Sequence, residues 1–471
     1  MNAVSRTPSP TIAPARRCAF AVVRRVFERG AYADLALHGE AAKLDRRDRA
    51  LAMRLAYGAV QRQGTLDHLI ERLAGRAVAR LDAPVLAALR LGLYELLYLD
   101  SAPDRAVVAD AVELAKVGDG RGHGLVNAVL RRAAREGREQ LLGSLDDATP
   151  ERAAIMHSHP LWVSRLWWNR LGAQDARALM AYDNEPGEVA LRVNTLVADA
   201  PTVAAELRRA SVAVHADGAQ SEALVLDGPF DAHDSPLWRS GALIAQSRAA
   251  MLVSRALDPQ AGERVLDLCA APGGKTTHLA ALMGDEGEVV AVERSERRAQ
   301  LLRETARRLR AESVRVEVAD AALASPERGA FDRVLVDPPC SGLGTLQARA
   351  DLRWRATPEA VAQMANAQRE ILAAGAEAVR PGGVLVYSTC TISPTESEHL
   401  IANFLESHAD FSLDDLAADR SEVGRPVVAS ALATSSSASA TPQRGGLGGT
   451  VLTLPHRDRT AGFFIARVHR S

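Results

Sequence analysis

The stretch Asp267-Leu-Cys-Ala-Ala-Pro-Gly-Gly-Lys-Thr-Thr-His278 joins a predicted strand, Arg264–Cys269, to a predicted helix, Thr276–Met283. Its small residues and glycines allow a ligand to approach the backbone closely. Glu293 ends the next predicted strand, where a carboxylate can accept both hydroxyls of a ribose. Asp320 follows the third strand, where its carboxylate can meet an adenine edge. Three such strand ends indicate a nucleoside cofactor at the carboxyl edge of a sheet.

Strands and helices continue to alternate towards the C-terminus. The other predicted strands are Glu288–Glu293, Val314–Val318, Arg333–Asp337 and Gly383–Ser388, and the other predicted helices are Glu296–Arg310, Pro358–Arg380 and Pro394–Ser407. Such an alternation of buried strands with helices predicts a parallel, doubly wound α/β sheet of the Rossmann-like kind over residues 251–471. A last strand, Phe463–Val468, is expected to return to this sheet.

Local signals mark two helix starts and one insertion in this region. Thr357-Pro358 predicts a capping residue followed by proline at the first helical position. Ser393-Pro-Thr-Glu396 predicts a capping box. Residues 417–450 are rich in serine, alanine and glycine, and they predict a flexible insertion.

The phosphate-binding motifs that the chain lacks narrow the identity of the cofactor. The sequence has no GxGxxG, which disfavours NAD and FAD, and it lacks the full GxxxxGK[ST] spacing, which disfavours ATP. S-adenosylmethionine remains, because its sulfonium cation tolerates an acidic pocket without phosphate. The sequence therefore favours a methyl donor.

Two cysteines follow consecutive strands of the predicted sheet. Cys340 lies in DPPCSG after the fourth strand, and Cys390 ends YSTC after the fifth. A single cysteine is more often a small buried apolar residue, but two at neighbouring strand tips favour chemistry. A thiolate that adds to C6 of cytosine makes C5 a carbon nucleophile that can take a methyl group. The helix that starts near Ser393 could lower the pKa of such a thiol.

The N-terminal part has a different pattern, with apolar residues at helical spacing. Ala19, Val22, Val23 and Val26 are one example, and residues 15–144 predict an all-α domain of six or seven helices. Residues 1–14 predict a loose tail, and residues 145–250 predict a small α+β module whose Trp167 and Trp168 belong to a core rather than to an RNA-stacking platform.

Composition limits the remaining possibilities. The 471 residues carry a net charge of −1, but residues 1–140 alone carry +7, which hints at a polyanionic partner. No apolar run is long enough to cross a membrane and no secretory signal begins the chain, so we expect a cytoplasmic protein. Its four cysteines form no CxxC pair, which argues against zinc and disulfide scaffolds. Lys275 is one of only three lysines, so its position suggests a site that arginine does not suit.

Together these motifs resemble the bacterial 16S rRNA (cytosine-5)-methyltransferases of the RsmB type. The resemblance spans the chain: the helical part looks like the NusB fold, and RVNTL (192–196), DLCAAPGGKTTH, DPPCSG, YSTC and GFFIAR follow in the family's order. It implies S-adenosylmethionine as the cofactor and 16S rRNA, free or in early assembly, as the partner of a monomer without a membrane anchor. With 16S rRNA as the partner, the net charge of +7 predicts that residues 1–140 dock the rRNA.

The resemblance implies roles for individual residues. Cys390 matches the nucleophile, Cys340 the cysteine that assists release of the methylated base, and Lys275 and Asp337 the residues that orient cytosine, Asp337 at its N3/N4 edge. The positions that match cofactor contacts are Cys269, Ala270, Ala271, Pro272, Gly273, Gly274, Lys275, Glu293, Asp320 and Asp337. No metal ligand is expected.

Two other functions remain open at this point. A NusB-like domain also suits a non-catalytic RNA-binding or antitermination protein, although such a protein would not need both cysteines. A cytosine-5 methyltransferase that acts on a different nucleic acid, such as DNA, is the other alternative. A DNA enzyme would use the cysteine of the Pro-Cys motif, Cys340, as its nucleophile.

Overall fold

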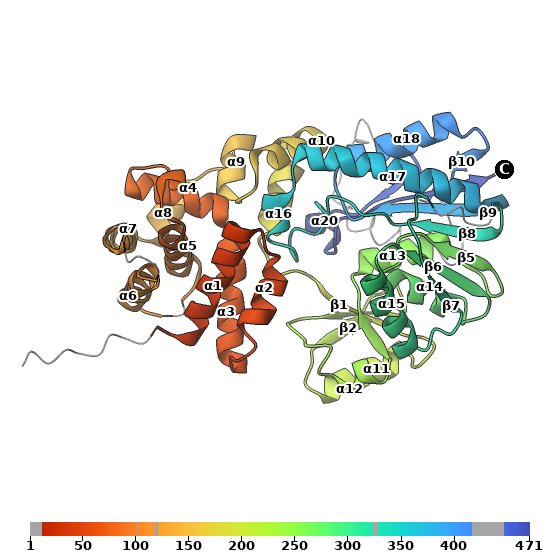
Figure 1. Ribbon diagram of the computed structural model, residues 1–471, viewed down its shortest axis with the longest axis horizontal. Coiled ribbons are helices and arrows are strands. Elements are labelled where there is room, and N and C mark those ends of the chain that lie inside the picture. The colour runs from red at the N-terminus through yellow and green to blue at the C-terminus, as the bar shows by residue number, and fades with distance from the viewer. Residues whose placement is uncertain (1–11, 101, 118–120, 324–327, 417–446) are drawn as a thin grey trace, which may run out of the picture. The chain divides into compact units, whose positions relative to one another are not determined.

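The chain divides into two compact units, which are described separately. The computed structural model describes residues 12–100, 102–117, 121–323, 328–416 and 447–471 (Figure 1). Unit 1 comprises the N-terminal residues to Glu185 together with Leu346–Arg355, and unit 2 comprises Pro186–Thr345 and Ala356–Ser471. Within the described residues, no helix is both long and apolar enough to cross a membrane.

Unit 1 is helical, as the sequence predicts. Its helices are α1 (Pro14–Arg29), α2 (Ala33–Glu40), α3 (Arg46–Gln61), α4 (Gln63–Ala74), α5 (Ala83–Tyr98), α6 (Asp104–Ala115), α7 (His123–Glu136), α8 (Arg138–Gly143), α9 (Pro150–Met156), α10 (Leu161–Tyr182) and α16 (Leu352–Arg355), with a 3-10 turn η1 (Val78–Arg80). The described part of residues 15–144 thus holds eight α-helices, more than the predicted six or seven. The short helices α2 and α8, of 8 and 6 residues, give little periodicity from which to predict them.

The apolar faces of helices α1 to α8 form one core. Ala19, Val22, Val23 and Val26 of α1 are all buried there, which confirms the helical spacing seen in the sequence. Trp167 of α10 is fully buried and Trp168 is half-buried. The prediction that these residues belong to a core is therefore confirmed for Trp167.

The segment Leu346–Arg355 belongs to unit 1 although it follows the Cys340 loop in the chain. The fully buried Arg353 donates hydrogen bonds to the backbone oxygens of Ser158, at 2.9 Å, and of Asp183, at 3.1 Å. Trp354 donates its indole N–H to the backbone oxygen of Val60, at 2.7 Å. Two long side chains thus fix this segment among the helices.

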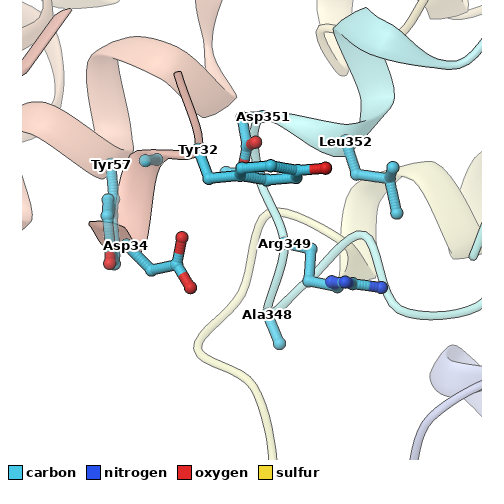
Figure 2. Close-up of a pocket in the computed structure, with 9 residues that line it drawn as sticks. Tyr32, Asp34, Tyr57, Ala348, Arg349, Asp351 and Leu352 are labelled. Atoms are coloured by element: carbon cyan, nitrogen blue, oxygen red, sulfur yellow. The ribbon is translucent and has the colours of Figure 1, made fainter. Parts of the chain in front are cut away.

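A solvent-open pocket lies beside the same segment. It contains about 490 Å³ of space between the start of α2, helix α3 and residues 348–352. Figure 2 shows Tyr32 and Asp34 on the α2 side and Asp351 on the other segment. Burial raises the pKa of Tyr57, which also lines the pocket, to about 12, with help from the nearby carboxylates.

The first part of unit 2 is a small α+β layer. Its four-stranded antiparallel sheet has the order β2-β3-β1-β4. The elements are β1 (Val189–Val193), α11 (Ala200–Arg209), β2 (Val214–Ala216), β3 (Ala223–Leu226), α12 (Pro236–Arg239) and β4 (Leu243–Ala245). Three of these strands are predicted from the sequence, and β3 is not.

The second part of unit 2 is an eight-stranded sheet with helices on its faces (Figure 1). Its strands are β5 (Arg264–Asp267), β6 (Glu288–Glu293), β7 (Val314–Val318), β8 (Phe331–Val336), β9 (Val379–Thr389), β10 (Phe411–Leu413), β11 (Val451–Leu452) and β12 (Phe464–Arg470). The helical elements are α13 (Arg248–Leu257), α14 (Gly274–Leu282), α15 (Glu296–Arg308), α17 (Pro358–Ala378), η2 (Pro394–Glu396), α18 (Glu398–Ser407) and α20 (Pro455–Asp458).

The large sheet is mixed rather than wholly parallel. Its strand order is β10-β12-β9-β8-β5-β6-β7, with β11 paired to β12. The five predicted strands β5, β6, β7, β8 and β9 pair in parallel, whereas β12 runs antiparallel to β9, and β10 and β11 run antiparallel to β12. The predicted parallel sheet therefore needs correction at this edge, because the C-terminal strand returns as an antiparallel neighbour.

Of the two predicted helix caps, one forms. Thr357 accepts a hydrogen bond from the backbone N–H of Ala360, and proline follows it, as predicted. The capping box at Ser393 is wrong, because the Ser393 side chain caps nothing and the Glu396 side chain bonds elsewhere. Two other predicted segments lie largely outside the described residues. These are positions 417–446 of the predicted insertion 417–450 and positions 1–11 of the predicted tail 1–14.

Candidate active site

The loop between β5 and α14 forms a tight turn at the carboxyl end of the sheet. Gly273 has a φ of +104°, a conformation that side chains rarely tolerate. A Cβ at this position would lie 2.5 Å from Cδ1 of Leu302 on α15. Both the backbone conformation and the contact with α15 therefore favour glycine at this position. The other predicted loop positions, Cys269, Ala270, Ala271, Pro272, Gly274 and Lys275, lie along the same turn.

Buried groups at both ends of the loop fix its course. The hydroxyl of Thr276 donates to Oδ2 of Asp267 at 2.8 Å, which ties the start of α14 to the end of β5. Burial raises the pKa of Asp267 to about 6. Burial also raises the pKa of the Cys269 thiol, with help from Asp267, so Cys269 is a neutral part of the loop.

The predicted ribose acceptor Glu293 lies buried at the end of β6. Its carboxylate accepts the backbone N–H of Ser295 at 2.9 Å and lies 3.3 Å from the Arg298 guanidinium. Arg298 also donates to the backbone oxygen of Ala271 at 2.6 Å, so it joins Glu293 to the loop. Arg298 is not predicted as a site residue. Its position five residues after Glu293, early in α15, is the feature of the sequence that could have indicated it. Asp320 follows β7, and its side chain is 38% exposed.

Lys275 and Asp337 form an ion pair at the centre of the site. The Lys275 ammonium lies 2.7 Å from Oδ2 of Asp337, and the Ser388 hydroxyl donates to Oδ1 at 2.7 Å. Burial alone would lower the pKa of Lys275, but the Asp337 carboxylate outweighs it and raises that pKa. The ammonium also lies 5.2 Å from the centre of the Phe463 ring, where a cation is favoured. Lys275 is therefore charged and held in one place.

The two predicted cysteines are brought together. Their Sγ atoms lie 3.3 Å apart, and neither is in a disulfide. The hydrogen bond with Cys390 and burial raise the pKa of Cys340 well above that of an ordinary thiol. The Cys340 thiol is therefore held in its neutral form, and the two sulfur atoms lie within hydrogen-bond distance of each other, with either able to donate.

A buried carboxylate behind the cysteines was missed as a site residue. Glu396 accepts the backbone N–H of Ser341 at 2.8 Å, directly after Cys340 in the chain. The sequence shows Glu396 only as part of the supposed capping box. Its spacing of six residues from Cys390 carries no signal of this contact, which depends on the tertiary fold.

The RVNTL segment supports the start of α14 from the small sheet. Arg192 is fully buried and donates to Gln246 at 2.8 Å and to Thr277 at 2.9 Å. Burial lowers the pKa of Arg192 to about 9. Asn194 donates to the backbone oxygen of Leu309 at 2.7 Å. These bonds join the segment to the large-sheet part of unit 2, although it lies far from the loop in the chain.

Comparison with known proteins gives a consistent result over most of the chain. Residues 254–469 match the family described as 16S rRNA methyltransferase RsmB/F, residues 13–135 match the NusB family, and residues 159–233 match an RsmF/B-like ferredoxin-like domain. A probable ribosomal RNA small subunit methyltransferase B from Synechocystis is 36% identical over 97% of this chain and 99% of its own. The protein of the same description from Bacillus subtilis is 34% identical over 93% and 95%.

A solved structure supports the same arrangement. The crystal structure of PH0851 matches 98% of this chain and 100% of its own, with a TM-score of 0.77 and 28% sequence identity. A methyltransferase homolog protein from Pyrococcus horikoshii matches 68% of this chain with a TM-score of 0.54 and 25% identity. The helical N-terminal domain, the small middle domain and the mixed-sheet domain are thus all found in known proteins.

Proposed function

The chain belongs to the 16S rRNA methyltransferase RsmB/F family, and on that premise we propose that it transfers a methyl group from S-adenosylmethionine to C5 of a cytidine in 16S rRNA. The observation that carries this proposal is the thiol pair, Cys340 and Cys390, with 3.3 Å between the sulfur atoms. An ordered pair of thiols is needed for covalent chemistry at a pyrimidine ring and not for RNA binding alone.

The loop residues fit S-adenosylmethionine. Small residues form the turn between β5 and α14, which lets a ligand approach the backbone. The carboxylates of Glu293 and Asp320 can accept hydrogen bonds from the hydroxyl and amine groups of a nucleoside. Residues Cys269 to Lys275, Glu293, Asp320 and Asp337 would hold the cofactor, which supplies an electrophilic methyl group when bound. Arg298 contacts both the Glu293 carboxylate and the backbone oxygen of Ala271, so it holds this carboxylate beside the loop.

In the first step Cys390 acts as the nucleophile. Its thiolate adds to C6 of the cytosine, and the electron pair of the C5–C6 bond moves to C5. The Cys340 S–H, which hydrogen-bonds to Cys390, stabilises the thiolate before the attack. Lys275 and Asp337 orient the cytosine ring. The Asp337 carboxylate accepts a hydrogen bond from the N4 amine, at the N3/N4 edge of the ring.

In the second step the methylated base is released. The proton on C5 leaves to a base, the electron pair reforms the C5–C6 double bond, and the C6–S bond breaks to return the Cys390 thiolate. Cys340, whose sulfur lies 3.3 Å from that of Cys390, is proposed to assist this release. It gives its own proton to solvent, and its thiolate then takes the C5 proton.

The helical N-terminal domain is proposed to dock the rRNA. Residues 1–140 carry a net charge of +7, and phosphate contacts supply most of the affinity of such complexes. Arg24 and Arg25, two arginines of α1, are paired with Glu28 and Glu40. The exposed arginines at the start of α3, which are Arg46, Arg47 and Arg49, therefore offer more charge to a phosphate backbone.

The experiment that tests this function is bisulfite mapping of 16S rRNA from a strain that lacks the protein. We expect one cytidine to lose its C5 methyl group and to regain it when the purified protein and S-adenosylmethionine are added. If 16S rRNA from this strain kept all its C5 methyl groups, the proposal would be contradicted. Two alternatives would then remain, a non-catalytic RNA-binding protein and an enzyme for another nucleic acid. Incubation of the protein with labelled cofactor and DNA separates those two.

A further inference from the structure

The Glu396 carboxylate is fully buried next to the segment that carries Cys340. It accepts the backbone N–H of Ser341 on Oε1 at 2.8 Å and the Ser341 hydroxyl on Oε2 at 2.5 Å. Ser341 directly follows Cys340 in the chain. Two charge-assisted hydrogen bonds to one residue therefore fix the backbone beside that thiol.

The same carboxylate is joined to the segment that carries Cys390. The hydroxyls of Ser341 and Thr391 lie 2.7 Å apart, and Thr391 directly follows Cys390. Ser341 gives its one hydroxyl proton to Glu396, and the Thr391 hydroxyl lies 2.7 Å from the Ser341 oxygen and 3.4 Å from Oε2 of Glu396. The residues after the two cysteines thus both belong to one hydrogen-bond network around Glu396.

Two further buried side chains complete the arrangement around Glu396. Gln368 of α17 donates to Oε1 of Glu396 at 3.1 Å and to the backbone oxygen of Pro339 at 2.9 Å. The Tyr387 hydroxyl of β9 donates to the backbone oxygen of Glu396 at 2.8 Å. Gln368, Tyr387 and Glu396 are all fully buried, and hydrogen bonds are stronger in such surroundings than in water.

We propose that Glu396 is a positioning residue for the methyl transfer: it holds the Cys340 and Cys390 segments so that the two sulfur atoms stay 3.3 Å apart. This inference rests on the proposed function in one respect, that the two thiols are the reacting groups. A reacting group that is misplaced by about 1 Å can lose about 100-fold in rate. A buried carboxylate with several donors is a rigid way to prevent such a displacement.

The carboxylate also acts on the charge of Cys340. The negative groups that face this thiol are Cys390, Glu396 and Asp337, and each of them raises its pKa. Neutralising Glu396 should therefore lower the pKa of Cys340. This effect can be measured without RNA or cofactor, because it needs only the thiol and an alkylating reagent.

The test uses Glu396→Gln, which removes the charge, and Glu396→Asp, which keeps the charge but shortens the side chain. Glu406→Gln, at an exposed position of α18, is the matched control. Three quantities are measured: the single-turnover rate of methyl transfer, the affinity for S-adenosylmethionine, and the alkylation of Cys340 against pH by peptide mass spectrometry. We expect both Glu396 variants to lose about 10- to 100-fold in rate with unchanged cofactor affinity. The alkylation of Cys340 should move to lower pH in Glu396→Gln.

Unchanged rates per folded molecule, or a Cys340 profile that Glu396→Gln does not move, would overturn the proposal even if the melting temperature falls. Should Glu396→Gln fail to fold, Thr391→Val removes only the hydroxyl that links the Cys390 segment to Ser341 and Glu396. We expect it to lower the rate about 2- to 10-fold, and an unchanged rate would count against the proposal. If the protein methylates no cytidine at all, the alkylation profile still tests Glu396, so the two failures can be told apart.

Discussion

The sulfur atoms of Cys340 and Cys390 lie 3.3 Å apart, at the tips of the neighbouring strands β8 and β9. The parallel pairing of these strands brings together two residues that are fifty positions apart in the sequence. The proposed roles of the two thiols differ: Cys390 attacks C6 of the cytosine, and Cys340 assists release of the methylated base. The difference leads to distinct expectations for their replacement.

Cys390→Ala should abolish methyl transfer, because no group remains to add to C6. Cys340→Ala should still allow the attack but impair release, so a covalent complex of protein and RNA should accumulate on a denaturing gel. Cys18→Ala, in the core of unit 1, is the control and should retain activity. If Cys390→Ala formed the complex and Cys340→Ala did not, the roles would be reversed, as in the alternative of a DNA-type enzyme.

Glu293→Ala should weaken binding of S-adenosylmethionine. The loss of charged hydrogen bonds worth about 1.5–3 kcal/mol corresponds to roughly 10- to 150-fold in affinity. The control is Glu296→Ala, whose side chain is 70% exposed and pairs with Arg303. Titration calorimetry measures both, and an unchanged affinity in Glu293→Ala would remove Glu293 from the cofactor site.

Gly273→Ala should destabilise unit 2 by about 2–4 kcal/mol, from backbone strain and from the clash with Leu302. Gly284→Ala is a matched control, since Gly284 also has a positive φ but has no atom within 4 Å of the added Cβ. It should cost about 1–2 kcal/mol. Urea unfolding measures both values. Equal losses in the two variants would show that Leu302 moves aside and that the turn is less tightly packed.

The stability of unit 2 should fall in mild acid because of His278. Burial lowers the pKa of His278 from 6.5 to about 4, although its ring lies 3.0 Å from the Glu222 carboxylate. Between pH 6.5 and 4 the His278 imidazole is protonated in the unfolded chain but neutral in the folded protein. The free energy of unfolding therefore decreases as the pH falls from 6.5 towards 4. The full effect is about 3 kcal/mol.

The measurement for His278 is a series of urea unfolding curves between pH 7 and pH 4. His278→Gln should lose this part of the pH dependence, and the exposed His399→Gln should keep it. Asp267, whose pKa burial raises to about 6, has the opposite dependence between pH 3.8 and 6, and it contributes equally to all three proteins. Identical curves for wild type and His278→Gln would contradict the prediction.

Replacement of Arg46, Arg47 and Arg49 together by alanine should weaken binding to 16S rRNA. It should also reduce the slope of log affinity against log salt, by about 0.7–0.9 for each phosphate contact that is lost. Arg24→Ala is the control, because that guanidinium is already bonded to Glu28. An unchanged slope in the triple variant would place the RNA on another surface.

The sequence predicts the fold well where a run of residues suffices to define an element. The bounds of β6 and β7 are predicted to the residue, because apolar residues between turn residues mark each strand. Short strands are predicted unevenly. The strands β2 and β4, of 3 residues each, are predicted, whereas β3 and β10, of 4 and 3 residues, are not, because so few residues give only a weak pattern. The antiparallel return of β12 depends on which edge of the sheet is free, and the local pattern does not contain that information.

The candidate site shows the same division. The positions of Lys275, Asp337 and the cysteines follow from strand ends, which lie together in any parallel sheet. The contacts of Arg298 and Glu396 join segments that are far apart in the chain, and they appear only in the folded structure. The pattern Ser393-x-x-Glu396 predicts that the Glu396 carboxylate binds the backbone N–H of Ser393. In the structure the carboxylate instead accepts the buried backbone N–H of Ser341.

The positions of Arg353 and Trp354 in unit 1 limit how this protein can be divided into fragments. The chain enters unit 1 a second time for the ten residues Leu346–Arg355, so neither unit is one continuous stretch of sequence. A protein cut back to unit 2 would expose a buried guanidinium and an indole, and a fragment that ends near residue 185 would leave the carbonyls of Ser158, Asp183 and Val60 without these donors. Weaker RNA binding after a truncation or a domain exchange could therefore come from lost RNA contacts or from the disrupted core of unit 1. Substitutions of surface residues do not disturb that core, so they test the RNA contacts alone.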